Sequence, residues 1–422
     1  MKEKIRVGYV GLGKRGRGML KRCFAQMADV EVAYLCDLSR ERMEQGQQYL
    51  LDNGREPAVL TANYQDILQD PTVDAVILMT GWDNRPELAK QSMLAGKYTA
   101  MEVGCSKTLE ECFDLIETYE KTGVPLMMLE NCCYGRREMM TLHMRELGLF
   151  GEIVHCDGAY GHYLADEDLF NNLEIKDPPH YRLAHYISGN RENYPTHALG
   201  PISKVLNLNR GNRMLRLSSF STKAVGLKDH AADRFGADSE YAKIDYKQGD
   251  IVNTVITCAN GETILLSLDT TIPRAYYSRN YTVRGTKGLY SEERKVGYLK
   301  GMAEPVENNE KEFFEKYDHP LHREYEELGT RGGHGGMDWL VCRAFVESVK
   351  NGTNTPIDAY DSVLWLAIGA LSEQSIKGGN IPVEVPDFTN GKWQDREPIV
   401  EGKYCLDKVC VDKETKIFHD IE

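Results

Sequence analysis

Hydrophobic and polar positions follow one rhythm over the first third of the chain. Continuous apolar runs such as VDAVILMT at 73–80 alternate with helical stretches such as NRPELAKQSMLAG at 84–96. The apolar runs predict strands that are buried on both faces, and the stretches between them predict helices. This alternation is typical of a parallel sheet that helices cover on its faces.

The rhythm changes after about residue 150, where longer segments alternate between apolar and polar residues. Three such segments cover 214–226, 250–271 and 280–293. The ANGE turn at 259–262 predicts a hairpin inside the second of them. This half of the chain therefore predicts an antiparallel sheet with one face free to bind something.

We expect two domains and a tail. Two amphipathic segments, 337–352 and 358–379, each end in glycine and complete the second domain as helices. The expected division is an α/β domain over 1–130, an α+β domain with an open, largely antiparallel sheet over 131–385, and a C-terminal tail over 386–422.

Charge and composition exclude several classes of function. The chain has 64 acidic and 51 basic residues and a net charge of −13, whereas nucleic-acid binding needs a basic face. No apolar run approaches the ~18 residues that a membrane span needs, and the charged start MKEKIRVGYVGLG lacks a signal-peptide pattern. We therefore expect a cytoplasmic protein that binds neither nucleic acid nor membranes.

The 11 cysteines are scattered along the chain, which suits reduced thiols better than a framework of disulfide bonds.

A glycine motif predicts a dinucleotide site near the N-terminus. Gly11, Gly13 and Gly16 form G-x-G-x-x-G between a predicted strand and a predicted helix, which is the context of a Rossmann domain. Such glycines allow a tight turn and let backbone N–H groups approach a pyrophosphate. Asp37 ends the second predicted strand, where a carboxylate binds a ribose diol and repels a 2′-phosphate. This favours NAD over NADP. The alternative is a glycine-rich turn without a ligand.

Further polar residues end the later strands of the predicted parallel sheet. Ligands bind at the carboxyl edge of such sheets, so these side chains are candidate cofactor contacts. Each of them could instead be a helix cap. They are Trp82, Asp83, Asn84, Arg85, Glu102 and Asn131.

Five motifs carry a resemblance to a known family. They are GKRGRG at 13–18, MEV at 101–103, LENCCYGRRE at 129–138, NYPTHALGP at 193–201 and RGGHGGMDW at 331–339. Through these motifs the chain resembles the Gfo/Idh/MocA oxidoreductases. Within that family it is most similar to glycoside hydrolase family 109, the NAD-dependent α-N-acetylgalactosaminidase type. The likeness extends from residue 5 to about residue 385.

One departure from the wider family changes the expected chemistry. Ordinary members have Glu-Lys-Pro after the fifth strand and use the lysine for proton transfer, whereas this chain has Glu102-Val103-Gly104. The resemblance implies a different reaction, in which NAD⁺ oxidises C3 of a glycoside. The ketone acidifies the C2 proton, a base removes it and the C1 leaving group is eliminated. Water then adds at C1, and the bound NADH returns the hydride, so the cycle is redox-neutral.

The resemblance also implies the site residues. Tyr194 and His197 become the catalytic pair, with His197 suited to act as base because its ordinary pKa lies near working pH. Substrate contacts fall on Tyr160, Arg182, Pro195, Thr196 and Tyr276, with Tyr163 and Tyr277 as alternatives for the two outer tyrosines. Cofactor contacts fall on Gly11, Gly13, Arg15, Gly16, Asp37, Trp82, Asp83, Asn84, Arg85, Glu102, Val103 and Asn131.

Several alternatives stay open at this point. His197 could be a structural histidine at a helix start, and His334 in GGHGG could belong either to a loop at the sugar site or to a buried turn that caps a helix. We expect no metal, since the nearby histidine pairs His180–His185 and His319–His322 lack companion ligands. The expected partner is a small glycoside, with a homo-oligomer formed through the second sheet. The alternative functions are an NAD-dependent sugar dehydrogenase that releases NADH and a non-catalytic sugar or nucleotide sensor.

Overall fold

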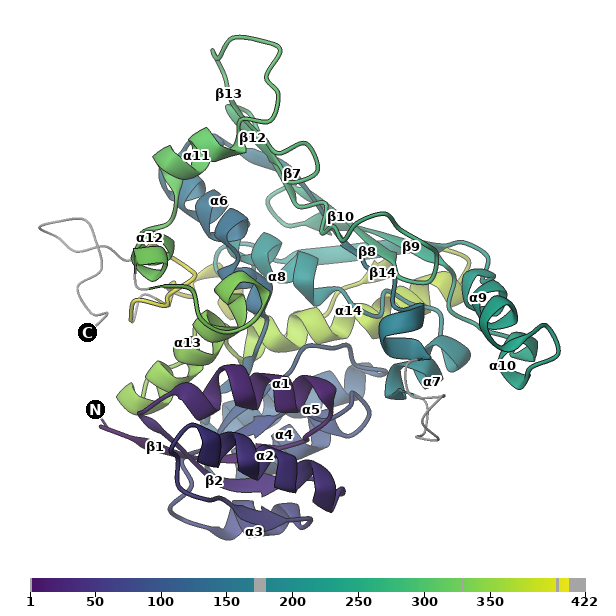
Figure 1. Ribbon diagram of the computed structural model, residues 1–422. Helices are drawn as coiled ribbons and strands as arrows, with labels where there is room; N and C mark the ends of the chain where they lie inside the picture. Colours follow the sequence, from purple (N-terminus) through teal and green to yellow (C-terminus); the bar gives the residue numbers. More distant parts are fainter. Residues whose placement is uncertain (1, 171–179, 328, 400–401, 410–422) are drawn as a thin grey trace, which may run out of the picture.

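A computed structural model describes residues 2–170, 180–327, 329–399 and 402–409. It contains two sheets. The first has six strands in the order β3-β2-β1-β4-β5-β6, and the second has eight in the order β13-β12-β11-β7-β10-β9-β8-β14. Figure 1 shows the first sheet and its helices in purple at the bottom and the second sheet above them, with the long helix α14 between the two.

The first sheet is wholly parallel, and the glycine motif joins its first strand to its first helix. This confirms the predicted α/β Rossmann class. The fifth and sixth strands end earlier than the sequence predicted, so that Glu102 and Asn131 follow their strands instead of ending them. The strands are β1 (Ile5–Val10), β2 (Val30–Cys36), β3 (Val59–Thr61), β4 (Ala75–Leu78), β5 (Tyr98–Met101) and β6 (Leu126–Met128). The helices are α1 (Lys14–Arg22), η1 (Phe24–Gln26), α2 (Arg40–Asp52), α3 (Tyr64–Gln69), α4 (Arg85–Leu94) and α5 (Leu109–Thr122).

The second sheet is antiparallel except where β10 runs parallel to β7, which confirms the prediction of an open, largely antiparallel sheet. Its strands are β7 (Ile153–Gly161), β8 (Met214–Ser221), β9 (Ile251–Cys258), β10 (Thr263–Asp269), β11 (Thr282–Gly285), β12 (Gly288–Ser291), β13 (Val296–Leu299) and β14 (Val383–Glu384). Its larger helices are α6 (Arg136–Glu146), α7 (Tyr181–Ser188), α8 (Thr196–Val205), α9 (Gly226–Phe235), α11 (Glu310–Tyr317), α12 (Pro320–Glu327), α13 (Met337–Asn351) and α14 (Ala359–Lys377). The short elements are η2 (Asn131–Tyr134), η3 (Ala165–Leu169), α10 (Glu240–Lys243), η5 (His334–Gly336) and η6 (Lys392–Gln394).

The alternation of buried and solvent-facing residues shows how the second sheet is covered. In β10, Ile264, Leu266 and Leu268 are buried, whereas the residues between them are partly exposed. The helices α8 and α14 pack against the buried face, with α8 on β7 and α14 on β8. Because α14 also packs on α5 and β6, the same helix fixes the second sheet to the first domain.

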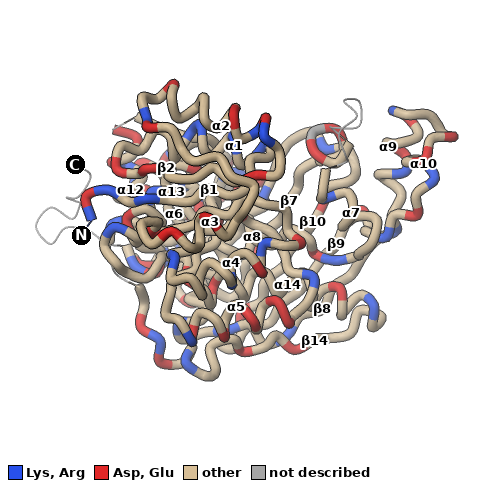
Figure 2. Tube along the Cα trace, turned by 90° about the horizontal axis from the view of Figure 1, so that it is seen from below, with Lys and Arg blue, Asp and Glu red and all other residues tan. Residues whose placement is uncertain are grey.

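Charge and cysteine positions add two facts about the molecule. Figure 2 shows acidic and basic residues intermixed along the chain in that view. The ten cysteines among the described residues are buried and not in disulfides, which agrees with the expected reduced thiols.

Among the described residues, no helix is both long and apolar enough to cross a membrane.

Candidate functional site

The glycine loop between β1 and α1 has the shape that a dinucleotide needs. Gly11 has a φ of 92°, and a Cβ on Gly16 would lie 2.1 Å from the carbonyl oxygen of Gly11. A Cβ on Gly13 would meet nothing within 4 Å, so this glycine borders free space. Asp37 follows β2 and accepts hydrogen bonds from the backbone N–H groups of Leu12 (2.6 Å) and Ser39 (2.9 Å). The loop and the Asp37 carboxylate therefore fit a pyrophosphate and a ribose diol.

Arg15 at the start of α1 is held by two carboxylates from distant parts of the chain. Its Nε donates to Glu102 Oε2 at 2.9 Å, and its two terminal nitrogens form a bidentate pair with Asp338 at 2.8 and 2.9 Å. The predicted cofactor residues Arg15 and Glu102 thus lie together, and the Arg15 side chain keeps 32% of its surface exposed. A guanidinium fixed in this way presents its charge beside the glycine loop.

Asp338 is one of two candidate site residues that sequence reasoning missed, and the other is Glu130, which contacts His197. The Asp338 side chain is wholly buried at the first turn of α13, where it also accepts from Asn131 Nδ2 at 2.8 Å and contacts His334 Nδ1 at 2.9 Å. Burial alone would raise the pKa of Asp338, but hydrogen bonds from His334 and Arg15 outweigh it and lower that pKa. A signal was present in the motif, because Asp338 follows His334 by four residues at the start of a predicted helix.

The glycines of RGGHGGMD explain how the loop reaches this carboxylate. Gly335 and Gly336 have φ values of 65° and 99°, and a Cβ on Gly336 would come within 2.4 Å of the Tyr325 ring. The His334 side chain is 56% exposed and does not cap α13, so the expected alternative of a buried capping turn is wrong. Through Asp338 the motif contacts Arg15 and Asn131, two of the predicted cofactor residues.

Four predicted cofactor residues follow β4, and the structure separates their roles. Arg85 is buried and donates to the carbonyls of Thr80 and Val103 (2.7 Å), so it ties together the chain after β4 and the chain after β5. Trp82 is also buried, and its Nε1 donates to the same Val103 carbonyl at 3.2 Å. Arg85 and Val103 thus shape this edge of the sheet.

The other two of these residues are exposed. Asp83 is paired with Lys107 at 2.5 Å and lies 3.3 Å from His185 Nε2. Asn84 occupies the N-cap position of α4, as its sequence context suggested, but its side chain makes no capping hydrogen bond. Both side chains remain accessible at the carboxyl edge of the first sheet.

An aromatic cluster surrounds His197 at the start of α8. The rings of Tyr160 and Tyr194 stack with 4.2 Å between centroids, and Tyr194 meets the His197 ring edge-on at 4.9 Å. The guanidinium of Arg182 lies 4.9 Å from the centroid of the Tyr194 ring and is held by Asp168 at 3.0 Å. Four of the predicted catalytic and substrate residues are therefore in one place.

The remaining predicted substrate residues are divided. Tyr277 contacts Tyr160 edge-on at 6.3 Å, whereas Tyr276 points to Glu293 and is 59% exposed. The structure therefore favours Tyr277 over the expected Tyr276, and Tyr160 over Tyr163, whose hydroxyl bonds to His230 instead. Pro195 and Thr196 are buried at the start of α8.

His197 is paired with a buried carboxylate. Its Nδ1 lies 2.7 Å from Glu130 Oε1, which also accepts from the backbone N–H of Cys132 at 2.9 Å. Burial alone would raise the pKa of Glu130, but the electrostatic interaction with His197 and the hydrogen bonds to the carboxylate outweigh it and lower that pKa. The pairing fixes the orientation of the imidazole ring and leaves Nε2 for a ligand. It therefore argues against the hypothesis that His197 is a purely structural histidine.

The same contact makes a group that could be mistaken for a metal centre. Ligand atoms of Glu130, Cys132 and His197 lie within 4.8 Å of one another. However, Glu130 and His197 already bond to each other, and the Cys132 sulfur faces the guanidinium of Arg279 at 3.3 Å. A cation would have to displace a charged hydrogen bond and approach an arginine, so this geometry favours proton transfer over metal binding.

The chain is similar to known proteins over most of its length. Residues 5–130 match the family described as "Oxidoreductase family, NAD-binding Rossmann fold", and residues 134–395 match "Glycosyl hydrolase 109, C-terminal domain". A "Glycosyl hydrolase family 109 protein" of Stenotrophomonas maltophilia is 37% identical, with 95% of this chain and 93% of that protein covered. An "Alpha-N-acetylgalactosaminidase" of Tannerella forsythia is 36% identical, with 93% and 88% covered.

Solved structures show the same fold at low sequence identity. Levoglucosan dehydrogenase in complex with NADH and levoglucosan superposes with a TM-score of 0.68 at 16% identity, covering 91% of this chain and 100% of that one. An apo scyllo-inositol dehydrogenase of Lactobacillus casei gives 0.63 at 15% identity, covering 91% and 99%.

Replacing Asp338 by asparagine tests its role beside the cofactor loop. Asp338→Asn removes the charge that holds Arg15, and a hydrogen bond to a charged group is worth about 1.5–3 kcal/mol. We expect the dissociation constant for NAD to rise about tenfold or more, measured by titration of the protein's intrinsic fluorescence. Asp114→Asn, which removes a surface pair with Lys90, should change it less than about twofold. An unchanged affinity for NAD in Asp338→Asn would show that Asp338 does not contribute to cofactor binding.

Glu192 provides a pH test of the segment that carries Tyr194. Burial raises the pKa of Glu192 from its ordinary value of 4.5 to about 8. Between pH 4.5 and about pH 8, the Glu192 carboxyl keeps its proton in the folded protein and loses it in the unfolded chain. The free energy of unfolding therefore falls as the pH rises, by up to about 1.4 kcal/mol per pH unit. Glu192→Gln should flatten this slope in denaturant titrations from pH 5 to pH 8, whereas the exposed Glu384→Gln should keep the wild-type slope. Equal slopes in all three proteins would contradict the burial argument.

Proposed function

Because the chain belongs to the glycosyl hydrolase 109 family, it is a glycosidase, and we propose that it cleaves N-acetylgalactosaminides or related glycosides in a redox-neutral cycle with bound NAD. The substrate class is suggested by the relative from Tannerella forsythia, whose name is alpha-N-acetylgalactosaminidase. NAD in place of NADP is suggested by Asp37, since a carboxylate at the ribose repels a 2′-phosphate.

One observation carries the proposal: two histidines are each held through Nδ1 by a buried carboxylate, and the two pairs are linked. Glu130 binds His197, and the next residue, Asn131, donates to Asp338, which binds His334. Glu130 and Asn131 follow β6 at the carboxyl edge of the first sheet, where dinucleotides bind in this fold. Elimination followed by hydration needs both a base and an acid, and we assign these roles to His197 and His334.

When bound, NAD supplies a hydride acceptor for the C3 position of the sugar and later the donor that restores it. The protein's own residues then handle the protons. His197 takes the proton from C2, with Glu130 stabilising the imidazolium. Tyr194 binds the C3 hydroxyl and shuttles its proton away as the ketone forms and back as the ketone is reduced. The Arg182 guanidinium orients the sugar and stabilises the enolate oxygen. His334 gives a proton to the departing oxygen at C1 and then activates the water that adds there.

The cofactor residues have separate proposed tasks. Gly11, Gly13 and Gly16 admit the pyrophosphate to the N-terminus of α1. Arg15 lies beside the loop as a fixed positive charge, and Asn131 places its amide near the nicotinamide ribose. Trp82, Asp83, Asn84, Arg85, Glu102 and Val103 shape the carboxyl edge between these groups.

We also propose the wider context of the enzyme. Phe220 and Val255 are 52% and 40% exposed on the solvent face of the second sheet, which supports a homo-oligomer formed through that face. The domain boundaries at residues 130 and 385 and a cytoplasmic location stay predictions.

The direct test of the function is a screen of chromogenic α- and β-glycosides with the purified protein. We expect release of the chromogenic alcohol without net formation of NADH, followed by absorbance in the same cuvette. Accumulation of NADH with free sugars, without cleavage of any glycoside, would instead make the protein a sugar dehydrogenase.

Substitution of His197 tests the assignment of the base. His197→Ala should lower the rate of cleavage about 10²–10⁴-fold, the usual contribution of general acid–base catalysis, and leave NAD binding unchanged. The matched control is His155→Gln, because His155 hydrogen-bonds Thr263 on the second sheet and lies outside the proposed site. Cleavage by His197→Ala at the wild-type rate would refute the assignment.

A further inference from the structure

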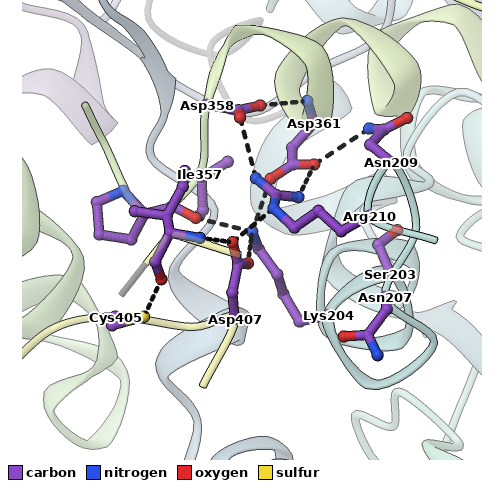
Figure 3. A network of polar contacts seen from close by, with 12 residues as sticks. Ser203, Lys204, Asn207, Asn209, Arg210, Ile357, Asp358, Asp361, Cys405 and Asp407 are labelled. Carbon is purple, nitrogen blue, oxygen red and sulfur yellow. Dashed lines mark hydrogen bonds and ion pairs between the residues drawn. The ribbon is translucent and has the colours of Figure 1, made fainter. Parts of the chain in front are cut away.

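The end of α8 that lies away from His197 is embedded in a buried network of charges (Figure 3). Lys204 is 4% exposed, and its Nζ lies 2.6 Å from Asp361 Oδ2, 2.9 Å from Asp407 Oδ1 and 2.7 Å from the Pro356 carbonyl oxygen. Three segments therefore meet at one ammonium group: α8, the start of α14 and the C-terminal tail.

Arg210, which follows α8, joins the same three segments. Its guanidinium contacts Asp358 and Asp361 at 2.9 Å each, and its Nε lies 2.5 Å from Asp407 Oδ2. Arg396 of the tail pairs with Asp358. The three carboxylates balance the three cations, which a buried cluster requires because each ion is costly to remove from water.

The tail also contacts the segment that carries the partner of His197. Tyr404 accepts, through its carbonyl oxygen, a hydrogen bond from the Tyr134 hydroxyl at 2.8 Å. Tyr134 ends η2, the turn that begins directly after Glu130. Tyr404 and Asp407 are three residues apart in the tail, and they hold the two segments from which Glu130 and His197 extend.

The packing between these segments leaves little freedom. A Cβ on Gly200, in the middle of α8, would lie 2.8 Å from Glu130 Cγ and 3.0 Å from the Cys133 sulfur. Lys204 and His197 are seven residues apart, about 10 Å along one helix. A displacement of the Lys204 end along the helix axis therefore moves His197 against Glu130.

We propose that the tail acts as a clamp that sets the Glu130–His197 distance, with Asp407 as a positioning residue for the reaction. The inference rests on the proposed role of His197 as base. Asp407 touches neither Glu130 nor His197, and it acts through α8, the helix that carries both Lys204 and His197.

The test compares two substitutions at Asp407 with a control in the same tail. Asp407→Asn removes the charge, and Asp407→Glu keeps it but moves the carboxylate by one methylene group. The control is Asp387→Asn, because Asp387 contacts Arg213 and Thr389 instead of α8. The activity is measured as kcat per bound NAD, so that any unfolded fraction does not count.

We expect both Asp407 variants to lose about 10- to 100-fold in kcat per bound NAD, the scale of a misplaced catalytic group, with KM changed less than about twofold. Amide hydrogen exchange in the peptide covering 194–205 should become faster in Asp407→Asn. Asp387→Asn should match the wild type in both measurements.

Two outcomes overturn the clamp. One is wild-type kcat per bound NAD in both Asp407 variants, and the other is wild-type exchange in 194–205 together with a lowered kcat. If the wild-type chain cleaves no glycoside, the proposed function fails separately, while the exchange measurement still reports on the clamp.

Discussion

The site depends on a carboxylate that is buried without becoming neutral. Glu130 has no exposed surface, and burial favours its protonated form. The structure offsets this cost with the backbone N–H of Cys132 and with His197, and the resulting pKa is lowered. Since an ionised buried group needs its partners in place, Glu130 fixes how the His197 ring at the start of α8 is turned.

The same principle repeats one residue later, and it joins the two domains. Asn131 reaches Asp338 at the start of α13, and Asp338 in turn holds Arg15 and His334. The loop that receives a pyrophosphate and the loop that carries a candidate acid are therefore fixed by one carboxylate. A glycosidase that first oxidises its substrate needs the sugar, the cofactor and the proton-transfer groups in register, and short buried contacts between the domains provide it.

The sequence predicted what depends on local pattern. The parallel sheet, the glycine loop, Asp37 and the grouping of Tyr160, Arg182, Tyr194 and His197 were found from periodicity and motifs, the last group through a family resemblance. Two contacts complete the site: Glu130 with His197, 67 positions apart, and Asn131 with Asp338, 207 positions apart. No local sequence pattern predicts contacts over such separations. Arg85 shows the converse, because a charged residue at a ligand-binding edge turned inward to bind backbone carbonyls. The choice between Tyr276 and Tyr277 depended on which way an irregular segment turns, which periodicity does not encode.

The measurement that tests the central claim most directly is turnover of the cleaved glycoside in D₂O, with NMR analysis of the released sugar. If His197 removes the C2 proton during elimination, the product should carry deuterium at C2 from the first turnovers, while the total NADH stays constant. Cleavage that leaves the original hydrogen at C2 would contradict the account, because the bond at C1 would then break without the oxidised intermediate.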